Sequence, residues 1–265
     1  MNIKEKEIID FYLAPNPIKK TCANFHIGET KLRKILNENN VHIRRPGEHC
    51  RKYEYDKDFF FKQSADLGYI LGLIAADGTI GSNDNRIEIE LQEEDKEILE
   101  KIRQIIHLTR PVKIYSTKTQ YIKSKLWIED QEIKNQLVNV FHLPPRKTYE
   151  HNNFYFPKDS LNKEFWKDYI RGYFDGDGSV KDSNHTITFQ IDGTNKKLIE
   201  EIRDIIQNFT NVQCQINILQ GVNLSKYRIY AYGNNAKIIF DWLYDTCSSL
   251  YMKRKKEKYY ELLMK

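Results

Sequence analysis

The pattern of apolar and polar positions occurs twice along the chain, with an offset of 100 residues. The segments "ILEKIRQII" from Ile98 and "LIEEIRDII" from Leu198 carry apolar residues at helical spacing and predict two amphipathic helices. Before each helix, "RIEIELQ" or "TITFQI" alternates with a period of two, which predicts a β-strand. After each helix come two more strand-like segments, "PVKIYS" and "SKLWIED" in the first copy and "CQINILQ" and "KYRIYAY" in the second. We therefore expect two α+β repeats, each ordered helix, strands, helix, strands, helix.

Each copy opens with an apolar helical segment that ends at an Asp-Gly step. The segment "YILGLIAADGTI" starts at Tyr69, and its counterpart "YIRGYFDGDGSV" starts at Tyr169. Small residues recur at a spacing of four, which places them on one face of each helix. They are Gly68, Gly72 and Ala76 in the first copy, and Gly172 and Gly176 in the second. A face without large side chains lets two backbones approach closely, so the copies are expected to meet along these helices.

Asp77 and Asp177 stand at the C-terminal ends of these two helices, where unpaired carbonyl groups already carry partial negative charge. Two carboxylates at adjoining ends repel each other unless cations lie between them. Oxygen ligands of this kind suit Mg²⁺. The sequence therefore predicts a divalent metal site between the copies. Such a site points to phosphodiester hydrolysis, in which metal ions activate water and stabilise the leaving oxygen.

The chain resembles the LAGLIDADG homing endonucleases, whose nine-residue signature aligns with "ILGLIAADG" (70–78) and "IRGYFDGDG" (170–178). The resemblance covers about residues 63–265, and Ala75 replaces the first acid of the signature in the first copy. It implies an α+β fold of two pseudo-symmetric αββαββα repeats that form a DNA saddle. It also implies a monomeric, site-specific endonuclease that cuts both strands of a long double-stranded DNA target.

The resemblance further implies the ligands of the metal ions. These would be the carboxylates of Asp77 and Asp177, with the backbone carbonyls of Ala76 and Gly176 beside them. Mg²⁺ is the expected cofactor, and Mn²⁺ is expected to substitute for it. Ca²⁺ is expected to bind without supporting cleavage.

In the family, a polar strand residue, often glutamine, helps to order the hydrolytic water. Gln92 and Gln190 fall in matching places after the two motifs and are the expected counterparts. Ordinary outward polarity of a strand is the alternative explanation for both glutamines.

A lysine late in each copy is also typical of the family, where it polarises the water network or the transition-state charge. We expect Lys147 in "LPPRKTYE" and Lys255 in "LYMKRKKEKY" to fill this role. Lys253 and Arg254 are close rivals, because the second segment is densely basic. A solvated helix face is the simpler reading of such a run.

Positive charge is concentrated near the N-terminus. Residues 1–57 hold 12 Lys and Arg against 8 Asp and Glu, which accounts for +4 of the chain's net charge of +5. The apolar first helix is expected to break at Pro15 and Pro17, and a short helix over 18–25 and a third near 29–39 follow. This pattern resembles a helix-turn-helix.

In a helix-turn-helix, the helix after the turn enters the major groove of DNA. The candidate contact residues are therefore Thr30, Lys31, Arg33 and Lys34. A small three-helix packing unit with a solvated basic face is the alternative.

The expected domain organisation has five parts. They are a helix-turn-helix unit (1–46), a basic and aromatic linker (47–62), the first repeat (63–150), an inter-repeat linker (151–163) and the second repeat (164–265). No uninterrupted apolar run is long enough for a membrane span, and the start "MNIKEKEIID" resembles no signal or transit peptide. The four cysteines form no CxxC pair, which favours reduced thiols, so we expect a cytoplasmic protein without a membrane partner.

Other functions on the same fold stay open. A catalytically silent relative would act as a DNA-binding regulator or as an RNA-binding intron maturase. Retention of Asp77, Asp177 and the two glutamines weighs against a silent protein, although maturases also retain such residues. An endonuclease within an intein would require splicing residues, and the ends "MN" and "LLMK" favour a free-standing protein instead.

Overall fold

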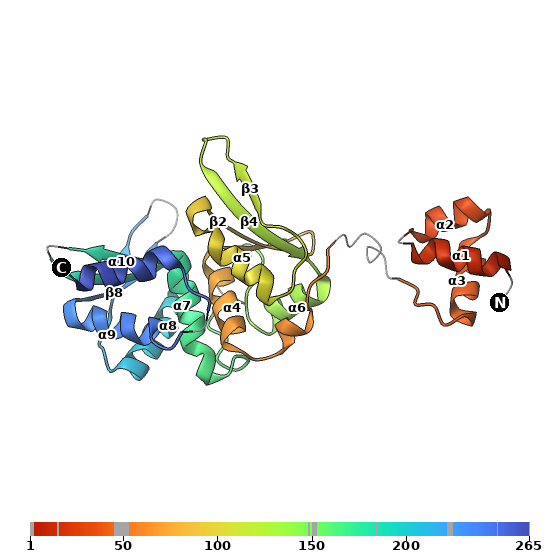
Figure 1. The fold of residues 1–265 in the computed structure, drawn as a ribbon. Coiled ribbons are helices and arrows are strands. Elements are labelled where there is room, and N and C mark those ends of the chain that lie inside the picture. Colours follow the sequence, from red (N-terminus) through yellow and green to blue (C-terminus); the bar gives the residue numbers. More distant parts are fainter. Residues whose placement is uncertain are drawn as a thin grey trace. The chain divides into compact units, whose positions relative to one another are not determined.

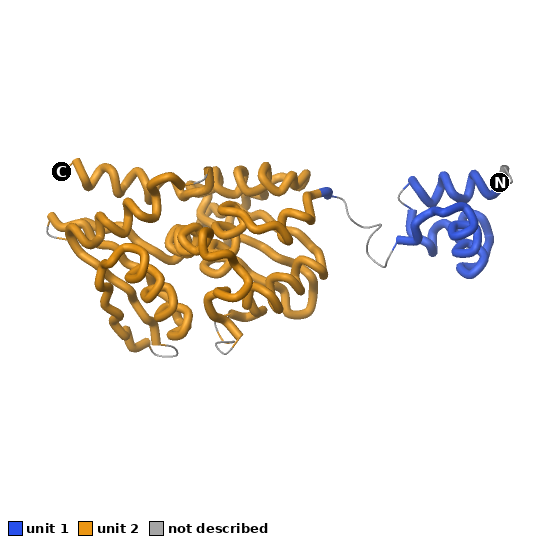
Figure 2. The backbone as a smooth tube through the Cα atoms, turned by 90° about the horizontal axis from the view of Figure 1, so that it is seen from below, with its two compact units in different colours: residues 1–54 blue, residues 55–265 orange. Residues whose placement is uncertain are grey.

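The computed structural model describes residues 3–14, 16–44, 53–147, 149, 153–183, 185–221, 225–247 and 249–264. The chain forms two compact units, residues 1–54 and 55–265 (Figure 1 and Figure 2). The boundary falls inside the expected linker 47–62, of which residues 47–52 lie outside the described part. Residues 55–62 of that linker belong to the larger unit, in which the Tyr55 hydroxyl donates to Asp130 over 2.5 Å.

The smaller unit contains three helices, α1 (Ile3–Leu13), α2 (Ile18–Phe25) and α3 (Glu29–Glu38), as the sequence predicts. Pro17 precedes the first residue of α2, and His26 ends that helix in the left-handed conformation. The helices share one apolar core. Its buried residues are Ile8, Ile9, Tyr12, Leu32, Ile35 and Leu36.

The first repeat of the larger unit follows the predicted order. Its elements are η2 (Asp58–Phe61), α4 (Ala65–Asp77), β1 (Gly78–Ile80), β2 (Arg86–Gln92), η3 (Glu93–Asp95), α5 (Lys96–Ile105), β3 (Lys113–Ser116), β4 (Ile122–Glu129) and α6 (Gln131–Asn139). The strands form an antiparallel sheet in the order β1-β2-β4-β3.

The second repeat has the same topology. Its elements are η5 (Lys163–Phe165), α7 (Trp166–Asp177), β5 (Gly178–Asp182), β6 (Ile187–Gly193), α8 (Lys196–Thr210), β7 (Gln215–Leu219), β8 (Lys226–Tyr232), α9 (Gly233–Tyr244) and α10 (Lys253–Leu263). The sheet order β5-β6-β8-β7 repeats that of the first copy, which confirms the two-repeat α+β fold.

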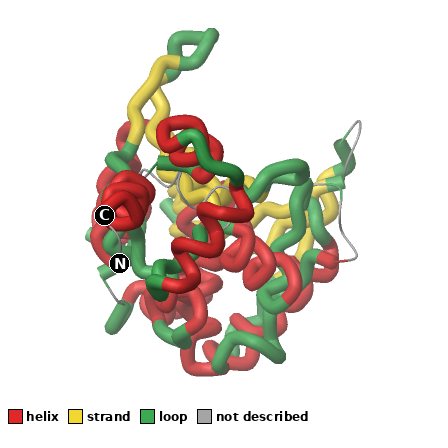
Figure 3. The backbone as a smooth tube through the Cα atoms, turned by 90° about the vertical axis from the view of Figure 1, so that its right-hand side faces the viewer, coloured by secondary structure: helices red, strands yellow, loops and turns green. Residues whose placement is uncertain are grey.

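Each sheet buries one face and presents the other. In β2, Ile87, Ile89 and Leu91 are buried, whereas the intervening Glu88 and Glu90 are half-buried on the opposite face. This alternation follows from the period of two in a strand. Figure 3 shows the strands of the larger unit in yellow and the helices in red.

Helices α4 and α7 pack backbone to backbone and join the repeats. A Cβ atom added at Gly72 would lie 1.9 Å from the Tyr169 carbonyl oxygen, and one added at Gly172 would lie 2.1 Å from the Tyr69 carbonyl oxygen. No side chain fits into such gaps. The predicted face of small residues is therefore the contact surface between the two copies.

Candidate active site between the repeats

The helices α4 and α7 end side by side at Asp77 and Asp177. Strands β1 and β5 begin at the next residue, so each aspartate lies where a helix turns directly into a strand. A Cβ atom added at Gly176 would lie 2.8 Å from Asp77 Oδ2. The Asp77 carboxylate therefore reaches across the interface to the end of the opposite helix.

The electrostatics of the two aspartates show that they share one site. Burial raises the pKa of the Asp77 carboxyl, against the opposing charges of Lys147 and Lys255. The Asp177 side chain reaches solvent at the edge of the site, yet desolvation by surrounding protein atoms, followed by the Asp77 charge, raises its pKa to about 6. The predicted repulsion between the carboxylates is thus present in the folded chain.

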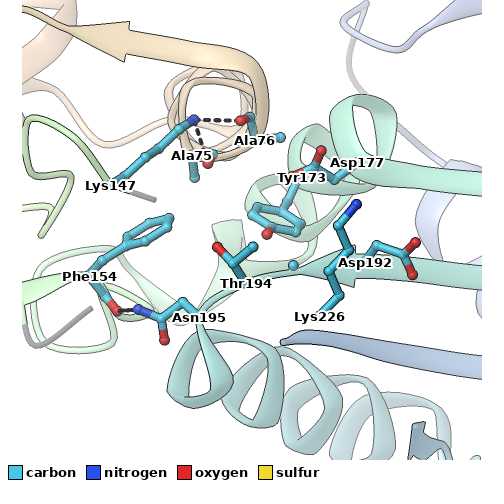
Figure 4. A pocket seen from close by; sticks show the side chains of 11 residues that line it. Ala75, Ala76, Lys147, Phe154, Tyr173, Asp177, Asp192, Thr194, Asn195 and Lys226 are labelled. Atoms are coloured by element: carbon cyan, nitrogen blue, oxygen red, sulfur yellow. Dashed lines mark hydrogen bonds between the residues drawn. The ribbon is translucent and has the colours of Figure 1, made fainter. Parts of the chain in front are cut away.

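Both expected lysines reach the helix ends. Lys147 Nζ donates to the carbonyl oxygens of Ile74, Ala75 and Ala76 at 2.7, 2.7 and 2.5 Å. Figure 4 shows the contacts with Ala75 and Ala76. Burial lowers the pKa of the Lys147 ammonium to about 8, against the opposing charges of Asp177 and Asp77. Because an ammonium group has three donors, these carbonyls use all of its hydrogens.

Lys255 occupies the corresponding place in the second copy. Its Nζ donates to the carbonyl oxygens of Phe174, Asp175, Gly176 and Gly178, at 2.9, 2.6, 3.1 and 2.7 Å. Burial also lowers the pKa of this ammonium to about 8. The carbonyls of Ala76 and Gly176, expected as metal ligands, therefore accept hydrogen bonds from lysine in this structure.

Lys253 and Arg254, the alternatives to Lys255, do not contact the end of α7. Lys253 is exposed, and its Nζ lies 3.8 Å from Glu257 on the same helix. Arg254 donates from Nε and Nη2 to the Asp95 carboxylate, at 2.8 and 2.9 Å. Arg254 therefore ties α10 to the first repeat, and Lys255 alone of the three reaches the end of α7.

The expectation that Gln92 and Gln190 occupy matching places is wrong. Gly78 faces Ile89, whereas Gly178 faces Ile191, so the second hairpin is two residues longer. Gln190 lies opposite Ser179, and the corresponding residue opposite Thr79 is Glu88.

Gln92 lies farther along its strand, opposite Lys123, and is exposed. The Glu88 carboxylate is paired with Arg86 and lies 3.4 Å from Lys125 Nζ. The two halves of the candidate site therefore differ at this strand position, with a carboxylate in the first repeat and an amide in the second.

The sequence reasoning gave no role to Asp175, the first acid of the second signature. Its carboxylate is fully buried and accepts hydrogen bonds from the Tyr69 hydroxyl, the Tyr244 hydroxyl and the Met252 backbone amide, at 2.8, 2.8 and 2.7 Å. Asp175 thus fixes the segment that carries Lys255. The sequence did contain a signal for this role, because Asp175 stands where the first copy has Ala75.

A pocket of about 230 Å³ adjoins the Asp177 side of the site (Figure 4). Its polar lining includes Lys147 and Asp177, together with Tyr173, Asp192 and Lys226, which the sequence reasoning did not select. These three side chains come from α7, β6 and β8, so only the folded chain brings them together.

The donor chemistry at the helix ends suits a divalent cation. Two carboxylates supply hard oxygen ligands of the kind that Mg²⁺ and Ca²⁺ prefer. Across the residues that the structure describes, no group of three or more His, Cys, Asp or Glu side chains is placed to hold a metal ion. Further ligands would therefore have to come from water, phosphate or backbone oxygens.

The four candidate DNA-contacting residues of the smaller unit are exposed on α3. They are Thr30, Lys31, Arg33 and Lys34. Arg33 pairs with Glu29 at 2.8 Å, and Lys34 Nζ lies 3.7 Å from Glu38. Pairs as exposed as these are weak and leave both cations accessible to a phosphate.

Comparison with known proteins identifies the family. The model of the LAGLIDADG-like domain matches residues 64–134 and 164–237. These segments lie in the two repeats and make up more than half of the chain. The chain belongs to the LAGLIDADG family.

The similar proteins include an uncharacterised one, MJ0314 of Methanocaldococcus jannaschii, which is 24% identical over 184 residues. That match covers 64% of this chain and 63% of MJ0314, so the chain spans less than two thirds of that relative. The structure of the homing endonuclease I-WcaI bound to its DNA recognition sequence has a TM-score of 0.53 at 13% identity, covering 83% of this chain and 96% of I-WcaI.

Two further structures resemble this chain with lower TM-scores. I-DmoI in complex with DNA and Ca has a TM-score of 0.48 at 15% identity, covering 70% of this chain and 93% of that one. The N-terminal LAGLIDADG domain of DUF199/WhiA has a TM-score of 0.45 at 14% identity, covering 70% of this chain and 83% of that one.

Among the described helices, none combines the length and apolar character needed to cross a membrane.

Proposed function

We propose that this chain is a metal-dependent endonuclease that hydrolyses both strands of a long double-stranded DNA site and acts as a monomer. The observation that carries the proposal is the pair Asp77 and Asp177 at the adjoining ends of α4 and α7, each beside a largely buried lysine. Repelling carboxylates are costly unless cations bind between them. One chain supplies both carboxylates, so no second subunit is required.

Each residue of the site has a role in this proposal. Asp77 and Asp177 would hold Mg²⁺, which supplies an activated water and stabilises the leaving 3′ oxygen. Lys147 and Lys255 use their hydrogens on backbone carbonyls, so they act on the reacting phosphate through charge. Gln190 lies on the open face of its sheet, where its amide can orient a water molecule.

The open faces of the two sheets suit a DNA duplex. Basic and aromatic side chains alternate outward along neighbouring strands, and phosphate contacts from such groups position DNA. They include Lys113, Tyr115, Lys123, Lys125, Arg228 and Tyr230. Several are paired with acids on the same face, such as Lys123 with Glu90 at 2.6 Å and Arg228 with Asp192 at 2.6 Å. These pairs hold the basic groups in fixed positions.

The test is to incubate the full chain with a library of double-stranded DNA sites in Mg²⁺ and to sequence the cut ends. We expect paired cuts on the two strands at one long site, with Mn²⁺ replacing Mg²⁺. Ca²⁺ is the companion condition, in which the same site should be bound but left intact. Absence of cutting at every site in both Mg²⁺ and Mn²⁺ would overturn the proposal.

The second candidate is a DNA-binding protein that does not cleave. The lysines on the Ala76 and Gly176 carbonyls and the carboxylate of Glu88 favour it, because each differs from the expected catalytic arrangement. This protein would protect one DNA site equally in Mg²⁺ and Ca²⁺ without cutting it. A maturase would instead bind an intron RNA, so the same binding assay should also include RNA.

We also propose that the smaller unit binds DNA through α3. Replacing Lys31 with Gln in the full chain should reduce the slope of log K against log salt by about 0.9, the value for one phosphate contact on duplex DNA. The matched control is Lys258→Gln, an exposed lysine on α10 of the larger unit, which should leave the slope unchanged. Equal slopes for both variants would show that α3 makes no phosphate contact through Lys31.

A further inference from the structure

The two lysines of the site hold equivalent backbone positions in the two repeats. Lys147 binds the carbonyls of residues 74–76, and Lys255 binds those of residues 174–176, although the lysines themselves lie 108 residues apart. Lys147 comes from the chain after α6, and Lys255 from the first turn of α10. A turn in one repeat and a helix in the other thus deliver the same charged group to equivalent places.

The place that they occupy has an excess of negative charge. Each helix ends with carbonyl groups that carry partial negative charge, and Asp77 and Asp177 add two carboxylates at the same point. In both repeats, the ammonium group therefore lies where a divalent cation would otherwise be needed. Both lysines act on both aspartates through their charge.

The two lysines differ in how firmly they are held. The start of α10 is fixed by the Arg254 guanidinium, which donates to both carboxylate oxygens of Asp95, and by the Met252 amide, which donates to Asp175. Lys147 lies outside the helices and strands and makes three carbonyl contacts, against four for Lys255. Displacement of Lys147 therefore disturbs less of the structure.

We propose that Lys147 and Lys255 are built-in counter-ions that keep the helix ends assembled without metal, and that a divalent cation reaches the Ala76 carbonyl by displacing the Lys147 ammonium. This inference rests on the proposed function only in taking the helix ends as the metal site. It makes metal binding a competition between two cations for the same oxygen atoms.

The test compares the wild type, Lys147→Met and the control Lys253→Met in the full chain. Methionine keeps much of the length of the side chain but not the charge. In EDTA, Lys147→Met should melt about 5 °C or more below the wild type, because it leaves carboxylates and carbonyls uncompensated. Ca²⁺ should recover most of that loss, and calorimetry should show Ca²⁺ binding about tenfold tighter than in the wild type.

Lys253→Met should match the wild type in melting temperature and in Ca²⁺ affinity, since Lys253 makes only an exposed pair with Glu257. The proposal is overturned if Lys147→Met melts with the wild type in EDTA, or if its Ca²⁺ affinity is unchanged. Neither measurement involves DNA cleavage. A chain that cuts no DNA can therefore still support the counter-ion role, and an active nuclease can still refute it.

A measurement on the wild type decides the question if Lys147→Met does not fold. In ¹⁵N NMR of the lysine ammonium groups, two groups should exchange slowly in EDTA, because carbonyls hold their hydrogens. Ca²⁺ should shift the Lys147 signal, assigned with Lys147→Arg, more than the Lys255 signal. Fast exchange of every lysine in EDTA, or a Lys147 signal that Ca²⁺ leaves unmoved, would contradict the inference.

Discussion

Asp77→Asn and Asp177→Asn should each lower the rate of double-strand cleavage by about 10³-fold while leaving DNA affinity near that of the wild type. Each substitution removes a charge from the site where metal would be held, and neither carboxylate lies on the open face of a sheet. The measurement is single-turnover cleavage in Mg²⁺ beside binding of the same DNA in Ca²⁺. Asp182→Asn, which changes an exposed acid at the end of β5, is the matched control and should cut normally.

The same variants should be slightly more stable than the wild type in EDTA. Burial and the Asp77 charge raise the pKa of Asp177 to about 6, so its ionised form is disfavoured in the folded state. This destabilisation is absent below the unfolded pKa near 3.9 and grows as the pH rises through 6. Because Asp177 is partly exposed, solvent screening keeps the expected gain at neutral pH below about 1 kcal/mol.

If an Asp77→Asn or Asp177→Asn variant cuts both strands at the wild-type rate, the substituted residue is not part of the proposed metal site. A variant that loses DNA binding as well would show that the carboxylate supports the fold or the DNA surface instead. The combination of an undiminished melting temperature, normal DNA binding and lost cleavage is specific to the proposed chemistry.

Gly72→Ala should destabilise the larger unit by about 3 kcal/mol, and Gly172→Ala should do the same. The added methyl group would lie 1.9 Å from the Tyr169 carbonyl oxygen in the first variant and 2.1 Å from the Tyr69 carbonyl oxygen in the second. Backbone atoms cannot rotate away as a side chain does, so the helices must separate. Thermal and denaturant unfolding of the full chain measure the effect.

The graded control is Gly68→Ala on the same helix, where the new methyl group would lie 2.8 Å from the Phe165 carbonyl oxygen. This contact is less severe, and we expect a loss of about 1 kcal/mol. Equal melting of the Gly72 and Gly68 variants would show that the helices can part at little cost. Separation would also move Asp77 from Asp177, so cleavage should fall together with stability.

Much of the candidate site could be predicted from the sequence, because its residues belong to local patterns that occur twice in the chain. The Asp-Gly steps at Asp77 and Asp177 and the small residues around Gly72 and Gly172 lie within single helices, where spacing alone defines a face. Their duplication indicated that two such faces meet. The structure places both features as the patterns predict.

The glutamine pair shows where pattern reading failed. Sequence separation from the motif does not define a strand position when the intervening hairpins differ in length. Two extra residues in the second hairpin move Gln190 to the place that Glu88 holds in the first. Register depends on the turn and on cross-strand pairing, which the sequence of one strand does not contain.

The sequence by itself determined the two-copy architecture, the helix contact and the two aspartates, since each follows from a short local pattern that recurs 100 residues later in the chain. Only the tertiary structure decided which basic residue of "MKRKK" meets the helix end, because Lys253, Arg254 and Lys255 point in different directions from one helical turn. It also decided that the lysines bind the carbonyls beside the aspartates. Such contacts join residues 71 to 81 positions apart, and their geometry is fixed by packing between elements that no local pattern describes.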